Sequence, residues 1–315
     1  MRTVRTVSEL RAALAPARRE GRSIGLVPTM GALHDGHLSL IAGAREQCDV
    51  VVVSLFVNPA QFNERADLER YPRDESRDAA AAAAAGADVL FAPSADEVYP
   101  QGFATSVEVL GVTERLEGAA RGSEHFRGVS TVVTKLLCMV LPDVAYFGQK
   151  DAQQVVVVRR LVADLNLPVR IEALPTVREA DGLAMSSRNA LLAPEERARA
   201  LALSQALTAA GELAASGERS AQVLVDAAQA ALQRLDVEPE YVALVEPDTL
   251  EPIEELTGEA LLAIAARIGA VRLIDNVTLS PAAADSPATA EDEAAGAGRS
   301  LGQPLPGKAN ATCSA

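Results

Sequence analysis

The feature that most limits the fold is an alternation of strand and helix patterns through the first 177 residues. The stretch DVVVVSLFV (49–57) is continuously apolar, which is typical of a strand covered on both faces. Strands that alternate with helices over short connections form parallel sheets. We therefore predict an α/β fold with helices on both faces of a parallel sheet. The expected strands are 23–30 (closed by Pro28), 49–57, 88–93, 143–148 and 169–177, and the expected helices are 37–48, 73–87, 128–142 and 151–167.

The pattern changes after about residue 178. Two Ala- and Leu-rich helices are expected at 194–216 and 220–235, followed by three short strands in 240–277, so this part is predicted to be a smaller α+β domain. From 281 the chain consists mainly of Ala, Gly, Pro and Ser. Such a segment buries too little apolar surface to offset its ordering entropy, and we expect a disordered tail. The predicted divisions are 1–177, 178–280 and 281–315.

Charge and cysteine content exclude several classes of protein. The net charge of −14 argues against a nucleic-acid partner, because binding a phosphate backbone needs an excess of Lys and Arg. Cys48, Cys138 and Cys313 have neither metal-ligand spacing nor a disulfide pattern, and we expect the first two to be core residues in a reducing cytoplasm. The charged N-terminus does not resemble a secretory signal, and no apolar stretch approaches the length of a membrane span, so no membrane partner is expected.

Two of the three histidines lie in one strand-to-helix turn, PTMGALHDGH (28–37). Ligands of open parallel sheets bind at the carboxyl ends of the strands, and the free N–H groups of a helix start suit a phosphate. Gly31 and Gly36 allow a close backbone approach, and Asp35 is expected to cap the helix. His34 and His37 could bond phosphate oxygens, although ordinary surface histidines and a zinc site remain alternatives.

Six collinear motifs carry a resemblance to a known family. The stretches PTMGALHDGHLSL, SLFVNPAQF, RYPRD, HFRGVSTVVTKL, FGQKDAQQ and DGLAMSSRN resemble those of the pantoate–β-alanine ligases (pantothenate synthetases), which carry the HxGH signature of the nucleotidyltransferases. The resemblance implies a Rossmann-like nucleotide-binding catalytic domain, a smaller C-terminal lid domain and a homodimer. It also implies ATP-dependent condensation of pantoate with β-alanine through a pantoyl adenylate, with release of AMP and pyrophosphate. The alternative is another HxGH adenylyl- or cytidylyltransferase with a different acceptor.

Adenylation makes a carboxylate anion attack phosphorus within a polyanion, so the reaction needs positive charge and fixed donors around the phosphates. The resemblance implies catalytic roles for His37, His34, Lys150 and Arg188. MSSR (185–188) corresponds to the family's mobile phosphate loop, although Ser could equally cap the following helix. The implied ATP-binding residues are Pro28, Thr29, Met30, Gly31, His34, Gly36, His37, Gly148, Lys150, Asp151, Val177, Met185, Ser186, Ser187 and Arg188.

The acid and the amine need amide groups and an apolar wall more than charge. The resemblance implies that Gln61 and Gln154 bind pantoate, with Gln61 also near β-alanine, and that Phe56 and Met30 pack on the methyl groups of pantoate. We expect Gln153 to be exposed. His125 could face the pocket or cap a helix, and RGSEHF departs from the family pattern by one extra residue and a missing proline. Mg²⁺ is expected to be held mainly by ATP, with no assigned protein ligand.

Overall fold

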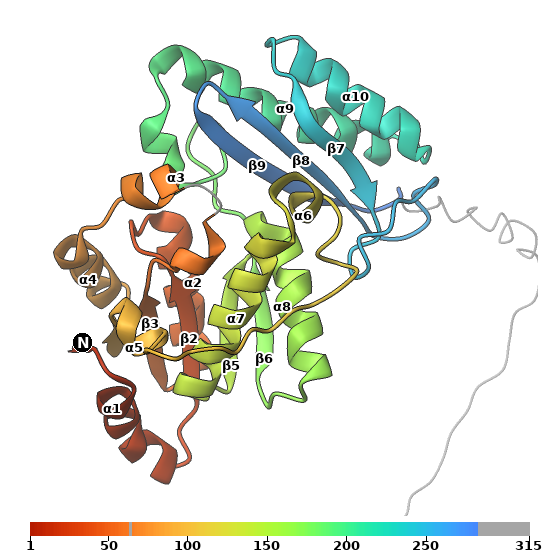
Figure 1. Cartoon of the computed structure of the whole chain (residues 1–315). Coiled ribbons are helices and arrows are strands. Elements are labelled where there is room, and N and C mark those ends of the chain that lie inside the picture. The colour runs from red at the N-terminus through yellow and green to blue at the C-terminus, as the bar shows by residue number, and fades with distance from the viewer. Residues whose placement is uncertain (63–64, 283–315) are drawn as a thin grey trace, which may run out of the picture. The chain divides into compact units, whose positions relative to one another are not determined.

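A parallel sheet of six strands organises the N-terminal part of the computed structural model (Figure 1). The strand order is β1-β4-β3-β2-β5-β6, and every neighbouring pair is parallel. The chain order reverses at β2, which lies between β3 and β5, and ligands of such sheets bind at this switch point. The structure describes residues 1–62 and 65–282. The strands are β1 (Arg2–Val4), β2 (Ile24–Thr29), β3 (Val50–Leu55), β4 (Val89–Phe91), β5 (Val144–Gly148) and β6 (Arg170–Leu174).

Helices cover both faces of this sheet, as the continuous apolar strands predict. In β3, Val50 and Val52 join one core cluster with α1, α7 and α8, whereas Val51 and Val53 join another with α2 and α4. This division follows from the alternation of side chains along a strand. The elements are α1 (Val7–Arg19), α2 (Asp35–Gln47), η1 (Pro59–Gln61), α3 (Arg65–Arg70), α4 (Glu75–Ala84), α5 (Ala95–Val98), α6 (Glu117–Arg121), α7 (Ser123–Val140), η2 (Gln149–Asp151), α8 (Ala152–Asp164) and η3 (Ser187–Leu191), where η marks a 3-10 helix.

The second sheet is antiparallel, in the order β7-β8-β9. One face packs on the two long helices through a core that includes Leu203, Leu232 and Ile264. The opposite face places Leu261 of the sheet in a cluster with Val156 of α8. The predicted fold class is thereby confirmed, while the division at residue 178 into two domains stays a prediction. The elements are α9 (Pro194–Ala215), α10 (Ala221–Gln233), β7 (Pro239–Val245), β8 (Ala260–Ile268) and β9 (Val271–Leu279).

Several local predictions differ from the structure. The first predicted strand continues past Pro28, which pairs in register with Ser54, while pairing of β2 with β5 ends at Leu26. Cys48 is buried as expected, but Cys138 is exposed rather than a core residue. Of the predicted tail, residues 281 and 282 are described, and 283–315 lie outside the described residues. None of the described helices combines the length and apolar character that a membrane span requires.

Candidate active site

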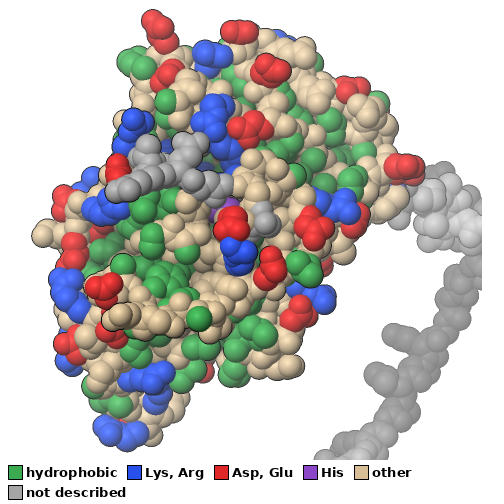
Figure 2. Space-filling model, in the orientation of Figure 1, with side chains coloured by type: hydrophobic (Ala, Val, Ile, Leu, Met, Phe, Trp, Pro, Cys, Tyr) green, Lys and Arg blue, Asp and Glu red, His purple; other side chains and the backbone are tan. Residues whose placement is uncertain are grey.

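A cavity of about 240 Å³ opens at the carboxyl ends of β2 and β5. Its lining includes Thr29 from the end of β2 and Gly148 from the end of β5. Figure 2 shows histidine on this face as a small area between acidic and basic side chains, in keeping with a recessed position. Of the predicted site residues, Gly31 alone does not line the cavity. The lining contains Pro28, Thr29, Met30, His34, Gly36, His37, Phe56, Gln61, Gly148, Lys150, Asp151, Gln154, Val177, Met185, Ser186, Ser187 and Arg188.

The turn between β2 and α2 is held from below by a buried carboxylate. Gly31 and Ala32 have φ values of 89° and 51°, a left-handed region that suits glycine at the first position. The backbone N–H groups of Ala32 and Leu33 donate to Asp78 of α4 at 2.9 and 2.8 Å. Gly31 thus shapes the turn rather than the wall of the cavity. The prediction that Asp35 caps α2 is wrong, because the helix begins at Asp35 and His34 occupies the cap position.

The rings of His34 and His37 lie in contact at the start of α2, with centroids 4.1 Å apart and planes tilted by 41°. The His34 backbone N–H donates to Nδ1 of His37 at 3.4 Å, so a neutral His37 ring carries its proton on Nε2. Burial, with the nearby charges of His34 and Lys150, lowers the pKa of His37 to about 3. Burial and the charge of Lys150 also lower the pKa of His34. Both rings are therefore neutral at physiological pH and serve as N–H donors. An anion bound beside them would favour their protonated forms.

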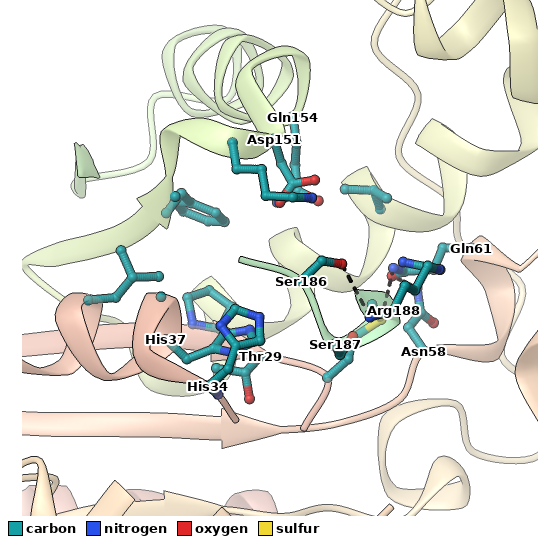
Figure 3. A pocket seen from close by; sticks show the side chains of 18 of the residues that line it. Thr29, His34, His37, Asn58, Gln61, Asp151, Gln154, Ser186, Ser187 and Arg188 are labelled. Atoms are coloured by element: carbon teal, nitrogen blue, oxygen red, sulfur yellow. Dashed lines mark hydrogen bonds between the residues drawn. The ribbon is translucent and has the colours of Figure 1, made fainter. Parts of the chain in front are cut away.

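Two further segments bring polar donors to the same cavity. The turn η2 carries Lys150 and Asp151 from the end of β5, and a second segment contributes Met185 to Arg188. Ser186 caps η3 by accepting the N–H of Arg188 at 3.3 Å. Its capping role and its place in the cavity wall therefore coexist. Figure 3 shows Ser186 and Ser187 between the histidines and Asn58, with Arg188 next to Gln61 in this view.

Amide groups form the opposite end of the cavity (Figure 3). Asn58 is 1% exposed and donates through Nδ2 to Gln61 Oε1 at 3.0 Å. The Tyr99 hydroxyl donates to Asn58 Oδ1 at 2.7 Å, and Gln61 Nε2 approaches the Met30 sulfur at 3.0 Å. These contacts fix the Gln61 amide in one orientation. Phe56, Met30 and an apolar wall from α7 also line the cavity, whereas Gln154 lies beside Asp151 (Figure 3).

The comparisons with known proteins identify a family for this chain. The family model described as pantoate-beta-alanine ligase matches residues 2–278. The chain belongs to the pantoate–β-alanine ligase family. It is 55% identical over 281 residues to pantothenate synthetase 1 of Bradyrhizobium diazoefficiens, covering 89% of this chain and 99% of that protein. The corresponding protein of Moorella thermoacetica is 53% identical over 280 residues, covering 89% and 99%.

Solved structures lead to the same family. The pantothenate synthetase of Thermus thermophilus has a TM-score of 0.85 and 48% identity, covering 89% of this chain and all of that one. The pantoate-beta-alanine ligase of Francisella tularensis, complexed with beta-gamma ATP and beta-alanine, has a TM-score of 0.72 and 34% identity, covering 88% and 97%. The chain is thus a ligase of this family. The comparisons support the main interpretation of the sequence and not the alternative nucleotidyltransferase.

The structure gives the positions of Gln153 and His125, for which the sequence predicted exposure and left two roles open, respectively. Gln153 is buried, not exposed as predicted, because its side chain holds a loop: Nε2 donates to the carbonyls of Val112 and Arg115 at 2.7 and 2.9 Å. His125 lines the cavity and also lies in the first turn of α7. Its Nδ1 is 2.9 Å from the Gln61 carbonyl, and burial with the charge of Arg121 lowers the pKa of His125 to about 4.

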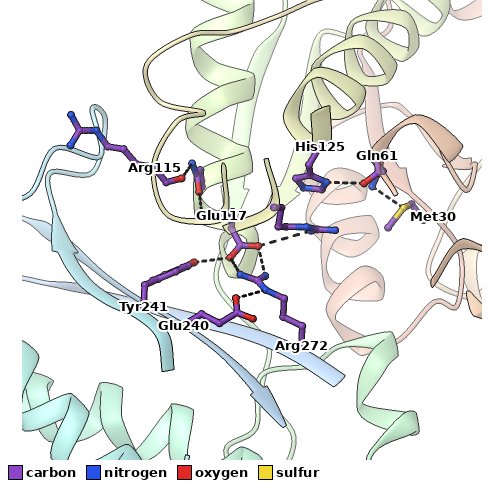
Figure 4. A network of polar contacts seen from close by, with 10 residues as sticks. Met30, Gln61, Arg115, Glu117, His125, Glu240, Tyr241 and Arg272 are labelled. Carbon is purple, nitrogen blue, oxygen red and sulfur yellow. Dashed lines mark hydrogen bonds and ion pairs between the residues drawn. The ribbon is translucent and has the colours of Figure 1, made fainter. Parts of the chain in front are cut away.

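The RGSEHF segment, expected to be a loop, joins the end of α6 to the start of α7 and lies beside a buried ionic network (Figure 4). Arg272 of β9 binds both oxygens of Glu117 at 2.6 and 2.7 Å, and the Tyr241 hydroxyl donates to Glu117 at 2.8 Å. Burial raises the pKa of Glu117, but the hydrogen bonds and charge of Arg272 outweigh this and hold it below the usual range. Arg121, 4.0 Å from Glu117, extends the network to the cavity.

Sequence reasoning missed several side chains that build this site. Asp78 resembles an ordinary charge in the exposed first turn of an Ala-rich helix, yet it is 2% exposed. Asn58 and Tyr71 lie within two of the six motifs that carry the family resemblance, but nothing else in the sequence distinguishes them from loop residues. The glycine of HFRGVS was a usable signal: a Cβ at Gly128 would lie 2.2 Å from the Ala60 carbonyl, so α7 can approach the loop of Asn58 only at a glycine.

Proposed function

We propose that this cavity condenses pantoate with β-alanine in two steps, through a pantoyl adenylate. The observation that carries the proposal is the convergence of donors for phosphate and amides for an acid within one cavity. His34, His37, Lys150, the segment 185–188, Gln61 and Gln154 all line it. The Francisella relative, whose structure holds beta-gamma ATP and beta-alanine, supports the same substrates for this chain.

In the first step, one carboxylate oxygen of pantoate attacks the α-phosphorus of ATP and pyrophosphate leaves. Two anions must approach each other, so the residues around the phosphates have to offset negative charge as it shifts toward the leaving group. Lys150 and Arg188 supply fixed charge in this proposal. The neutral histidines supply N–H donors, and the nearby triphosphate raises their proton affinity as it binds, since an opposite charge favours the protonated form.

In the second step, the free amine of β-alanine attacks the acyl carbon and AMP leaves. The adenylate solves the main difficulty, because a carboxylate is a poor electrophile and AMP is a far better leaving group than oxide. Gln61 and Gln154 orient the acid in this proposal, while Phe56 and Met30 pack against its methyl groups. Burying these groups away from water also protects the adenylate from hydrolysis.

A Mg²⁺ ion fits this site as a partner of the nucleotide rather than of the protein alone. Among the described residues, no group of three or more His, Cys, Asp or Glu side chains could hold a metal ion, and Asp151 is the one carboxylate in the lining. Mg²⁺ typically binds phosphate oxygens and water with only one or two carboxylates. When bound, it would neutralise and orient the triphosphate, with Asp151 available to it.

Three other expectations accompany this proposal. A homodimer, a cytoplasmic location and a lid role for residues 178–280 follow from the family resemblance and the sequence. Light scattering of the purified chain measures the first, and fractionation of cells that produce the native chain measures the second. Comparing amide hydrogen exchange of residues 178–280 with and without ATP and pantoate measures the third, because closure should protect segments of this region.

The function is tested by incubating the purified chain with ATP, Mg²⁺, pantoate and β-alanine. We expect pantothenate, AMP and pyrophosphate in equal amounts, and pantoate-dependent exchange of labelled pyrophosphate into ATP when β-alanine is left out. Omitting pantoate should abolish both signals. Pyrophosphate release that ignores pantoate and responds to another acceptor would contradict the proposal and favour a different nucleotidyltransferase.

A further inference from the structure

Two adjacent polar residues of β9 in the small sheet, Asp275 and Asn276, are both buried. Asp275 is 3% exposed and Asn276 is 6% exposed. Both line a small hollow that also borders Lys150 and Asp151. Burying a carboxylate and an amide is costly unless both are well bonded. Successive side chains of a strand point to opposite faces, so this pair can reach two different segments.

Asn276 holds the turn that carries Lys150. Its Nδ2 donates to the carbonyl oxygens of Gln149 and Lys150 at 3.0 and 2.8 Å. Its Oδ1 is buried without a hydrogen-bond partner in the described part of the chain. Only the NH₂ group of the Asn276 amide can donate to these two carbonyls. They therefore fix the orientation of the amide even though its oxygen has no partner. The contact therefore serves the turn η2 at a cost to the strand itself.

Asp275 holds the base of the other phosphate-facing segment. Its oxygens accept from Nη1 and Nη2 of Arg178 at 2.6 and 3.0 Å. Arg178 pairs with Ala184 in an antiparallel bridge, and its Nη1 also donates to the Gly182 carbonyl at 3.1 Å. The hairpin closed by these contacts leads directly into Met185, the first residue of the segment that ends at Arg188. One dipeptide thus contacts the supports of both segments.

We propose that Asp275 and Asn276 are positioning residues that hold the segments 149–151 and 185–188 in one register around the same triphosphate. The inference rests on the proposed function and concerns residues that act through Lys150 and Arg188. Phosphoryl chemistry depends on donors being placed together, and misplacing a group by about 1 Å can cost about a hundredfold in rate. The small sheet therefore contributes to adenylation by holding two turns that belong to different parts of the chain.

The first test replaces Asn276 by alanine and measures pantoate-dependent ATP–pyrophosphate exchange. We expect kcat/KM for ATP to fall about tenfold or more, because two hydrogen bonds that place Lys150 are lost. KM for β-alanine should change less than about twofold, since the second step makes no use of the triphosphate. Thr278→Ala, at an exposed position of the same strand, is the matched control and should behave like the unchanged chain.

A double-mutant cycle separates positioning from general stabilisation. If Asn276 acts through Lys150, Asn276→Ala should cost little more in a chain that already carries Lys150→Ala, because coupled residues are not additive. Multiplying losses would overturn the inference, as would unchanged exchange kinetics in an Asn276→Ala chain that has merely lost thermal stability. If that variant does not fold, Asp275→Asn, which keeps the shape, is tested in the same way with and without Arg188→Ala.

The same preparation distinguishes failure of the inference from failure of the proposed function. An unchanged chain that shows no pantoate-dependent exchange contradicts the function and with it the inference. An unchanged chain with full exchange, beside an Asn276→Ala chain of equal kcat/KM for ATP, contradicts the inference alone.

Discussion

At one end of the cavity, the polar groups come from turns and helix starts, whereas at the other end they come from amides already bonded to one another. His37 and Lys150 belong to segments that follow β2 and β5. Gln61 instead receives its orientation from Asn58, which in turn is held by Tyr99. The first end can respond to an anion by changing its protonation, and the second cannot.

This difference follows from the electrostatic cost of each kind of group. Cations gathered without a ligand repel one another and lose hydration, and burial together with neighbouring positive charges accordingly lowers the pKa of His37. Amides carry no charge and need only complete hydrogen bonding, which Asn58 obtains in a nearly fully buried position. We call the part of the cavity around His37 and Lys150 the phosphate end, and the part around Asn58 and Gln61 the amide end. We infer that the phosphate end becomes fully charged only when ATP binds, while the amide end is already hydrogen-bonded without a ligand.

The largest expected effect comes from the phosphate end. His37→Ala should leave the fold intact and lower pantoate-dependent ATP–pyrophosphate exchange by about two orders of magnitude or more, as for the loss of a donor that acts in the transition state. Circular dichroism and the thermal midpoint confirm folding. The chain offers no spare histidine as a control, since all three line the cavity. Turnover close to that of the unchanged chain would remove His37 from the mechanism.

A second effect is a pH dependence of stability. The folded-state pKa of His37 is about 3 and that of His125 about 4, both below the ordinary 6.5. As pH falls below 6.5, the unfolded chain therefore binds protons that the folded chain does not, and the free energy of unfolding falls. We expect each imidazole to contribute about 2 kcal/mol of loss by about pH 5.

Denaturant unfolding at a series of pH values measures this contribution. In chains with His37→Asn or His125→Asn, the difference between stability at neutral pH and at about pH 5 should be smaller than in the unchanged chain. Comparing chains at each pH cancels the titration of carboxylates that all of them share. Parallel profiles for the variants and the unchanged chain would mean that these imidazoles gain their protons as readily folded as unfolded.

An amide assigned to pantoate should affect the binding of that substrate alone. Gln154→Ala should raise KM for pantoate about tenfold and leave KM for ATP nearly unchanged, because the loss of an amide contact to the acid removes binding energy of that substrate. Steady-state kinetics with each substrate varied in turn makes the measurement. Gln101→Ala, at an exposed glutamine, is the matched control. Equal changes in both constants would contradict the assignment of Gln154 to pantoate.

The turn with His34 and His37 could be found from the sequence itself, whereas Gln61 and Gln154 were assigned only by resemblance to the family, and the reason is local. A turn such as PTMGALHDGH contains its strand end, its glycines and its histidines within ten residues, so one segment indicates both position and chemistry. Asp78 and Asn276 support the phosphate-facing turns from remote segments. Their partners are backbone groups, which leave no mark on the sequence at either position.

The fold was predictable for a similar reason, and the predictions that were missing or wrong have physical causes. The continuous apolar strands and the alternation with helices indicate a two-sided sheet wherever a segment carries its own pattern. The N-terminal strand β1 and the helix α1 were not assigned, although Thr6 and Glu9 form a reciprocal cap at the start of α1. Gln153 was placed in solvent because its partners, Val112 and Arg115, lie about forty positions earlier in the chain.

The smallest expected effect tests whether the amide end is arranged in advance. Tyr99→Phe removes only the hydroxyl that bonds Asn58 at 2.7 Å, and burial raises the pKa of that hydroxyl to about 12, so it is a neutral donor at working pH. The ring keeps its packing, and Asn58 Oδ1 keeps the weaker N–H of Ala60 at 3.3 Å. We expect KM for pantoate to rise about threefold, since one hydrogen bond acting through two amides is lost.

Tyr146→Phe removes a buried hydroxyl away from the cavity and serves as the control. A Tyr99→Phe chain with an unchanged KM for pantoate would show that Gln61 orients without this support. The two ends of the cavity would then differ in charge and not in how they are held.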